Sequence, residues 1–169
     1  MSDKYIGLDS NGIRKEVAAT VVSTGVAEAG DIVGLDSNGR LDVSVMPVGI
    51  GADTNVIVAS EALAAGDFVN VYNDTGTPKV RKADATTAGK YANGFVLASV
   101  LSSGNATVYA EGTNNQVTGA TAGRVFLSTT AGGFTSTPPS ASGNVTQCVG
   151  YAVSATAINF QSGEPVIRA

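Results

Sequence analysis

Histidine and tryptophan are absent from the 169-residue sequence, and cysteine occurs only once. Histidine is the usual general base and metal ligand near neutral pH, so its absence removes the serine and cysteine triads that depend on it. The single cysteine, Cys148, cannot form a disulfide within the chain, and it has no basic neighbour to activate its thiol. Its place in VTQCVGYAV predicts a small, buried side chain in a strand. We therefore expect a protein that is not an enzyme and that uses no cofactor or metal.

Charged residues are scarce as well, at 14% of the chain, with a net charge of -4 and a pI near 4.6. Nucleic-acid binding needs clustered cations, but acidic residues dilute the densest basic run, Lys79, Arg81 and Lys82. No stretch approaches the ~20 apolar residues of a membrane helix, and the N-terminus lacks the apolar run of a signal peptide. We expect no nucleic-acid or membrane partner, and a protein made in a cytoplasm that stays there or leaves it by lysis or within a particle.

The abundant residues are glycine, serine, threonine, asparagine, alanine and valine, which suit short strands joined by tight turns. From about Asn55, at least seven short apolar segments follow at spacings of roughly 8 to 12 residues. The sequence predicts an all-β protein. Residues 53–169 are expected to form a small β-barrel or sandwich body, and residues 1–52 an extended N-terminal arm with β-hairpins. The continuously apolar segment 95–101 is expected to be a strand covered on both faces.

Within the arm, the hexapeptide GLDSNG occurs twice, at residues 7–12 and 34–39. Asp and Asn side chains cap turns and Gly accepts a positive φ, so each copy predicts a hairpin or a sharp bend. The oxygens could also suit calcium, but Gly stands fourth from Asp9 rather than sixth, and Thr20 occupies the twelfth position, where a calcium loop has Glu. We therefore interpret both copies as turns. Residues 16–30, between them, are rich in β-branched side chains and predict a strand rather than a helix.

The second copy continues into Leu41, Val43 and Val45, which alternate with Asp42, Ser44 and Met46. Such alternation predicts an extended segment with one buried face. Pro47 and the glycines that follow mark the boundary between arm and body.

One local pattern recurs along the chain: a glycine, a charged residue, two apolar residues, and a second glycine nine or ten positions after the first. It begins at Gly30, Gly66 and Gly123, and we expect a hairpin at each. The starts are 36 and 57 residues apart, so the pattern is not the fixed repeat of a solenoid.

Several aromatic residues fall in predicted strands with apolar neighbours, where packing into the core is expected; a platform for stacking sugars or bases would instead need exposed rings. These residues are Tyr72, Phe95, Tyr109, Phe126, Tyr151 and Phe160.

Residues 56–169 resemble the small β-barrel domains of structural proteins of tailed bacteriophages, particularly capsid decoration (cement) proteins and head fibres. The segment LDSNGRLDVSVMPVGIG resembles the linker near the start of phage fibre and head-attached proteins, which are commonly homotrimers. The markers in the body are Gly66-Asp67, Lys82-Ala83-Asp84, Asn93-Gly94-Phe95-Val96, Val108 to Gly112, Gly123-Arg-Val-Phe-Leu and Val149-Gly150.

The resemblance implies a structural virion protein: a homotrimer on the outside of the phage head that stabilises contacts between major capsid proteins. It would be assembled in the host cytoplasm and located on the capsid surface. The alternative is a tail- or head-fibre module that recognises a bacterial surface glycan. The resemblance leaves open whether arm or body makes the main capsid contact. The candidate contact residues for capsid or trimer are Leu8, Ile32, Leu35, Leu41, Val43, Val45, Met46 and Val48.

Overall fold

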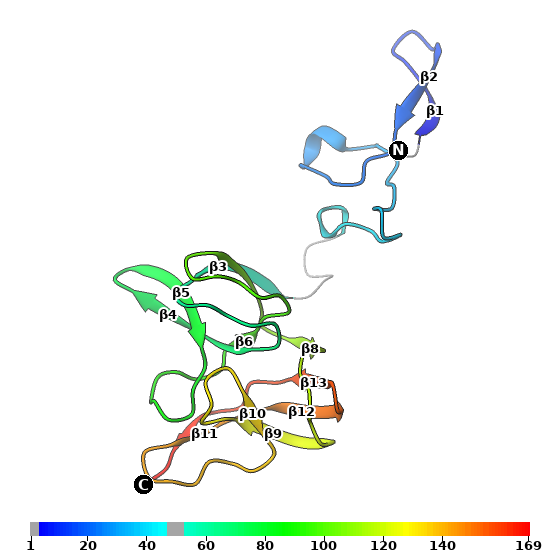
Figure 1. Cartoon of the computed structure of the whole chain (residues 1–169). Coiled ribbons are helices and arrows are strands. Elements are labelled where there is room, and N and C mark those ends of the chain that lie inside the picture. Colours follow the sequence, from blue (N-terminus) through cyan, green and yellow to red (C-terminus); the bar gives the residue numbers. More distant parts are fainter. Residues whose placement is uncertain (1–3, 47–52) are drawn as a thin grey trace. The chain divides into compact units, whose positions relative to one another are not determined.

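The computed structural model describes residues 4–46 and 53–169, and the chain divides into two compact units, Met1–Gly51 and Ala52–Ala169 (Figure 1). The protein is all-β, as predicted, and its only helical elements among the described residues are two 3₁₀ turns in the first unit. We call the first unit the arm and the second the body. The elements of the arm are β1 (Lys4–Leu8), β2 (Arg14–Ala18), η1 (Val26–Glu28) and η2 (Val43–Val45).

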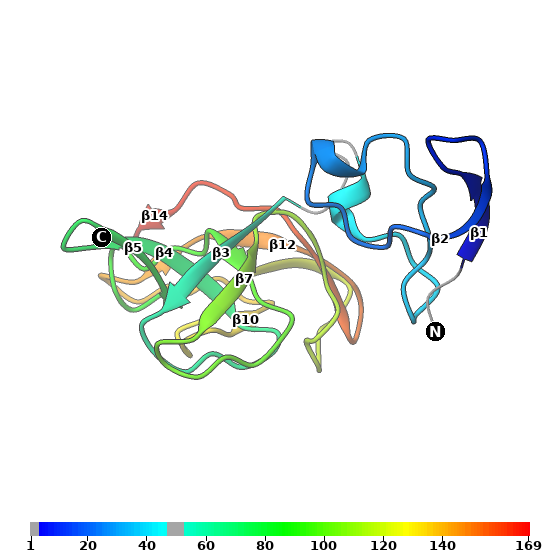
Figure 2. The same cartoon turned by 90° about the horizontal axis from the view of Figure 1, so that it is seen from above.

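Five strands of the body form a closed barrel in the order β3-β5-β4-β6-β7, which β7 completes by pairing with β3 (Figure 2). The pair β3 and β5 is parallel, and the other pairs are antiparallel. Small and branched side chains fill the interior of this barrel, which is narrow because it has only five strands. The strands are β3 (Thr54–Ala59), β4 (Phe68–Asp74), β5 (Thr77–Lys82), β6 (Gly94–Phe95) and β7 (Asn105–Tyr109); the filling residues are Ala59, Leu63, Val69, Val80, Val96, Ala106 and Val108.

The rest of the body contains a five-stranded antiparallel sheet in the order β10-β9-β12-β13-β8 and a separate pair, β11 and β14. Figure 1 shows these later strands, yellow to red, beside the green barrel. The strands are β8 (Gly112–Asn114), β9 (Gly123–Leu127), β10 (Phe134–Thr135), β11 (Val145–Thr146), β12 (Cys148–Ser154), β13 (Ala157–Phe160) and β14 (Val166–Ile167).

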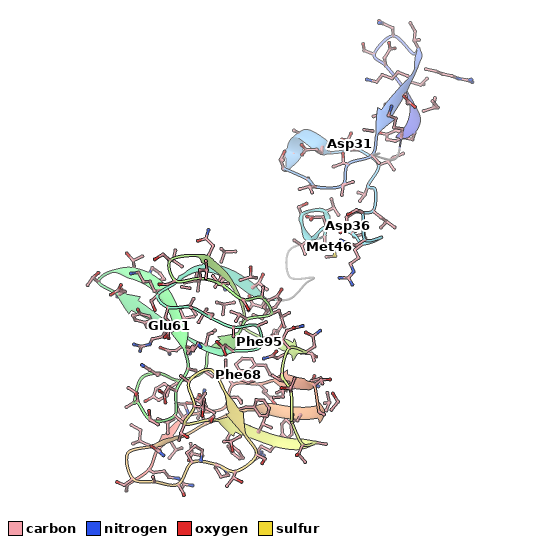
Figure 3. The ribbon with its side chains drawn as sticks, viewed as in Figure 1. Asp31, Asp36, Met46, Glu61, Phe68 and Phe95 are labelled. Atoms are coloured by element: carbon pink, nitrogen blue, oxygen red, sulfur yellow. The ribbon has the colours of Figure 1, made fainter. Side chains whose placement is uncertain are left out.

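A cluster of aromatic side chains joins the barrel to the sheet. Phe68 and Phe95 come from barrel strands, and their ring centroids lie 5.9 and 5.7 Å from that of Phe160 on β13 (Figure 3). All three rings are buried in one hydrophobic core. The prediction of a barrel or a sandwich therefore resolves into a barrel whose flank packs against an open sheet.

The apolar segment 95–101 is not the continuous strand that the sequence predicts. Strand β6 ends at Phe95, Val100 pairs with Leu63 in an isolated bridge, and Leu101 is 81% exposed. After Phe95, Val96 exchanges backbone hydrogen bonds with residues 66 and 67, just before β4, whereas the pairing of β6 with β7 is confined to Phe95 and Tyr109. The hydrophobic residues of this segment therefore make two separate contacts, one through Phe95 in β6 and one through Val100 beside Leu63.

The recurring glycine pattern marks a hairpin in two of its three positions. Gly66 precedes the β4–β5 hairpin, and Gly123 opens β9, which pairs with β10. Near Gly30 the prediction is wrong, because only Val33 pairs there, in an isolated parallel bridge to Thr20. The strand predicted over residues 16–30 likewise ends at Ala18 and gives way to η1.

The prediction that Cys148 is buried is also wrong, because its side chain is half-buried. Its Sγ atom lies 3.7 Å from the carbonyl oxygen of Gly150, to which the thiol donates. A β-bulge between Cys148 and Gly150 shifts the pairing of β12 with β9 at this point, so inward and outward positions depart from simple alternation.

Candidate interaction surface

The first GLDSNG copy closes the β1–β2 hairpin, as the sequence predicts. Asp9 Oδ1 accepts hydrogen bonds from the backbone N–H groups of Asn11 and Ile13, at 2.9 and 2.8 Å. Gly12 supplies the positive φ of 73°. The Asp9 side chain thus fixes the turn locally, and the two strands pair from Leu8 with Arg14 to Lys4 with Ala18.

The second copy forms the same turn with the same bonds. Asp36 Oδ1 accepts from the N–H groups of Asn38 and Arg40, at 2.8 and 2.9 Å, and Gly39 has a φ of 72°. These two hydrogen bonds lower the pKa of the Asp36 carboxyl below its usual range, and the bond from the Arg40 N–H has the larger effect. Both repeated carboxylates are thus used in turns, and in the described part of the chain no three metal-ligating side chains gather.

Whereas the turns are well bonded, the apolar side chains over residues 4–46 do not form a buried core. None of residues 4–46 is buried, although the unit folds into defined turns and a hairpin. Large hydrophobic side chains at ten positions are exposed: Ile6, Leu8, Ile13, Val22, Val26, Ile32, Val33, Leu35, Leu41 and Val43. An exposed apolar surface on this scale is typical of a region that binds another molecule.

The candidate contact residues that the structure describes lie on this surface or at its margin. Leu8, Ile32, Leu35, Leu41 and Val43 are exposed, whereas Val45 and Met46 are half-buried; Val48 lies outside the described residues. Sequence reasoning missed Ile6, Ile13, Val22, Val26 and Val33. The spacing of two between Ile6 and Leu8 was the available signal, because it puts both on one face of β1.

The predicted extended segment with a buried face over Leu41, Val43 and Val45 is wrong. Val43–Val45 is the 3₁₀ turn η2, because Asp42 caps it by accepting from Ser44 N at 2.9 Å. That bond also lowers the pKa of the Asp42 carboxyl. Within the chain, Val43 is 71% exposed rather than buried. A short capping side chain here outweighs the period of two.

Val45 and Met46 line a pocket of about 370 Å³ in the arm. Two bonds hold its walls: Ser23 N donates to Ser44 Oγ, and Thr20 Oγ1 donates to Asp31 Oδ2, each at 2.8 Å. The remaining lining residues are Thr20, Ser23, Glu28, Asp31, Val33 and Ser44.

The lining of this pocket combines apolar and acidic side chains. Apolar side chains of Val33, Val45 and Met46 accompany the acidic groups of Glu28 and Asp31. A side-chain hydrogen bond from Thr24 is the main cause that lowers the pKa of the Glu28 carboxyl. The pocket therefore suits an inserted side chain with an apolar stem and a polar or positive end, such as a lysine or arginine.

In the parts of the chain that the structure describes, no helix is both long and apolar enough to span a membrane. Comparison with protein-family models, with curated proteins and with solved structures found no match to this chain.

Proposed function

We propose that this chain is a structural virion protein of a tailed bacteriophage, a capsid decoration (cement) protein that binds the outside of the head as a homotrimer. Its partners are the major capsid protein and further copies of itself. The observation that carries the proposal is the arm, in which no described residue is buried while ten large apolar side chains are exposed. The resemblance of the body and linker to phage head proteins is the reason for proposing the major capsid protein as the partner of the arm.

The energetic argument follows from the missing core of the arm. A unit as small as Met1–Gly51 buries little of its chain's surface and is at best marginally stable alone. Burying a Val, Leu or Ile side chain contributes roughly 1.5–3 kcal/mol. Covering what ten such side chains leave exposed would therefore contribute on the order of 10 kcal/mol before association costs are subtracted. Contact with another protein supplies the core that the arm lacks.

The hairpin offers a second means of attachment. A two-stranded sheet leaves one edge of β1 and one edge of β2 unpaired among the described strands. Unpaired edges add readily to a strand of a neighbouring protein, with main-chain hydrogen bonds supplying affinity and exposed side chains supplying specificity. Ile6 and Leu8, on one face of β1, would then enter apolar sites of the partner.

Trimer symmetry would present three arms together, so that weak contacts combine into avid attachment. A protein that binds only the assembled shell stabilises it by mass action, by about 2.7 kcal/mol per site at a free concentration 100 times the dissociation constant. Repeated over many sites, this would clamp adjacent major capsid proteins together.

The test is to add the purified chain to undecorated shells of its phage and to measure cosedimentation and the temperature of shell disruption. We expect saturable binding and a higher disruption temperature with the full chain. The matched control is the body alone, residues 52–169, which we expect to fold but not to bind. Failure of the full chain to bind, or binding without stabilisation, would contradict the proposal; binding by the body alone would move the contact to the barrel or sheet.

A further inference from the structure

The outer face of the five-stranded sheet carries a row of four exposed residues, one on each of four adjacent strands. Tyr151 on β12 pairs with Arg124 on β9 and with Asn159 on β13, and Asn159 pairs with Thr113 on β8. Their sequence neighbours Val125, Ile158 and Asn114 are buried on the opposite face. At ~4.8 Å between strands, the row of Arg124, Tyr151, Asn159 and Thr113 is about 14 Å long.

Tyr151 is 43% exposed, contrary to the prediction that it packs in the core. Its hydroxyl accepts a hydrogen bond from Arg124 Nη2 at 3.2 Å, and the guanidinium carbon lies 5.8 Å from the ring centroid. This contact also raises the pKa of the Arg124 guanidinium. A cross-strand pair of this kind contributes some stability by itself. The Arg124–Tyr151 pair would have the same stabilising effect without the groove beside the Tyr151 ring, so the groove is a separate feature of this face.

That groove has a volume of about 780 Å³, within the range of small-molecule sites. Tyr151, Asn159 and Thr113 line it together with Glu111, Gln161 and Ser162. Asn159 Oδ1 accepts from Thr113 Oγ1 at 2.8 Å, which leaves the Asn159 amide nitrogen as a donor. The side chains of Glu111 and Gln161 make no hydrogen bond to any other described residue.

One wall of the groove is held in place from the core. Buried Gln147 donates from Nε2 to Ser162 Oγ at 3.1 Å and to Gly163 O at 3.3 Å. The same amide exchanges two hydrogen bonds with the backbone of Ala92. The segment beside Gln161 is therefore anchored before any ligand binds, which reduces the entropy cost of binding.

We propose that this groove binds a neutral oligosaccharide. The apolar C–H face of a sugar ring packs on the exposed Tyr151 ring, while its hydroxyls bond to Asn159, Gln161 and the Glu111 carboxylate. Glu111 is the charged residue of the lining, and its carboxylate disfavours phosphates and acidic sugars there. Because the groove lies on the body, this activity is separate from arm-mediated attachment, and it gives the chain a second partner.

The probe is a panel of neutral oligosaccharides built of glucose, galactose, rhamnose and N-acetylglucosamine, with an acidic oligosaccharide and single-stranded DNA beside them. Binding is followed by the side-chain amide signals of Asn159 and Gln161 in ¹⁵N-labelled full-length protein. We expect at least one neutral member to bind and to shift both signals. We expect Tyr151→Ala to weaken that binding about tenfold or more, because it removes the stacking surface.

Two variants control for the fold. Tyr151→Phe keeps the ring and should retain most of the affinity. Tyr72→Ala removes a half-buried barrel aromatic beneath Arg81, outside the groove, and should leave affinity unchanged. The proposal is overturned if no neutral member binds, if only the acidic sugar or DNA binds, or if Tyr151→Ala and Tyr72→Ala have equal effects. Shell binding by Tyr151→Ala should be normal, so failure here is distinguishable from failure of the decoration function.

Discussion

Gly150 and Gly123 show at single-residue scale how backbone conformation and space constrain the sheet. Both have unusual positive φ values, 136° and 129°. A Cβ added to Gly150 would overlap the carbonyl oxygen of Asn159, whereas one added to Gly123 would meet nothing within 4 Å. A substitution at Gly123 therefore tests conformational strain alone, whereas the same substitution at Gly150 adds a steric clash.

We predict that Gly150→Ala destabilises the body more than Gly123→Ala does. Gly123→Ala should cost about 1–3 kcal/mol, the usual range for a non-glycine residue in a strained conformation. Gly150→Ala should cost roughly a further 1–3 kcal/mol, because β13 must move away from β12. Urea unfolding of both variants measures the difference, and equal free energies of unfolding would contradict it.

Residue-level prediction from the sequence succeeded where the determinants were local. The turns at Asp9 and Asp36 depend on side chains that bond to backbone two and four positions away, so the hexapeptide contains all that is needed. Exposure of Tyr151 was missed because Val149, Tyr151 and Val153 alternate as though all three shared a face. The bulge before Gly150 puts Val149 inside and leaves Tyr151 and Val153 outside, and it depends on pairing with a distant strand.

At the scale of elements, specific hydrogen-bond partners, some near and some distant in sequence, decided the outcome against hydrophobic pattern. Alternation at residues 41–45 predicted an extended segment, but the Asp42 cap produces η2. The apolar run 95–101 predicted one strand, but Val96 pairs with Asp67 and Val100 with Leu63, 29 and 37 residues earlier, and these two contacts divide it. The spacing of hydrophobic residues predicts neither the Asp42 cap nor the pairing of segment 95–101 with Leu63 and Asp67.

The turn at residues 34–39 should lose its bonding at acid pH. The folded-state pKa of Asp36 is lowered from its ordinary value of 3.8, so its ionised form stabilises the turn at higher pH. That stabilisation begins to fall as the pH drops below 3.8 and is lost as the pH passes through the lowered folded-state pKa. Amide hydrogen exchange and chemical shifts of Asn38 and Arg40, followed as pH is lowered, measure the change.

The matched variant is Asp36→Asn, whose amide oxygen can accept the same two hydrogen bonds without titrating. We expect this variant to keep the turn and to lose its pH dependence over that interval. If the Asn38 and Arg40 amides respond to acid equally in both proteins, Asp36 is not the group responsible.

At the scale of the whole molecule, composition and turn spacing were enough to predict an all-β protein. They did not choose between a barrel and a sandwich, because that choice depends on pairs distant in sequence. β3 closes the barrel with β7, and β8 joins the sheet through β13, some 45 residues later. Nor did they reveal that none of residues 4–46 is buried, since the hydrophobic residues of the arm resemble those of the body in type and spacing.

The proposed trimer makes a prediction for the exposed surface of the arm. In solution the full chain should have about three times its 16.9 kDa chain mass, measured by analytical ultracentrifugation. The triple variant Leu35→Ser, Leu41→Ser, Val43→Ser should shift towards monomer, because it removes apolar area that association covers. None of the three side chains is buried, so thermal unfolding of the body should be unchanged.

The control replaces equally exposed apolar residues of the body: Val56→Ser, Leu101→Ser and Val166→Ser. If association depends on the arm, this variant keeps the mass of the parent chain, and only the arm variant dissociates and fails to bind shells. Dissociation of the body variant instead would assign the trimer contact to the body and leave the arm for the capsid. A full chain that is monomeric at every concentration would contradict the trimer altogether, since mass action raises the associated fraction as concentration rises.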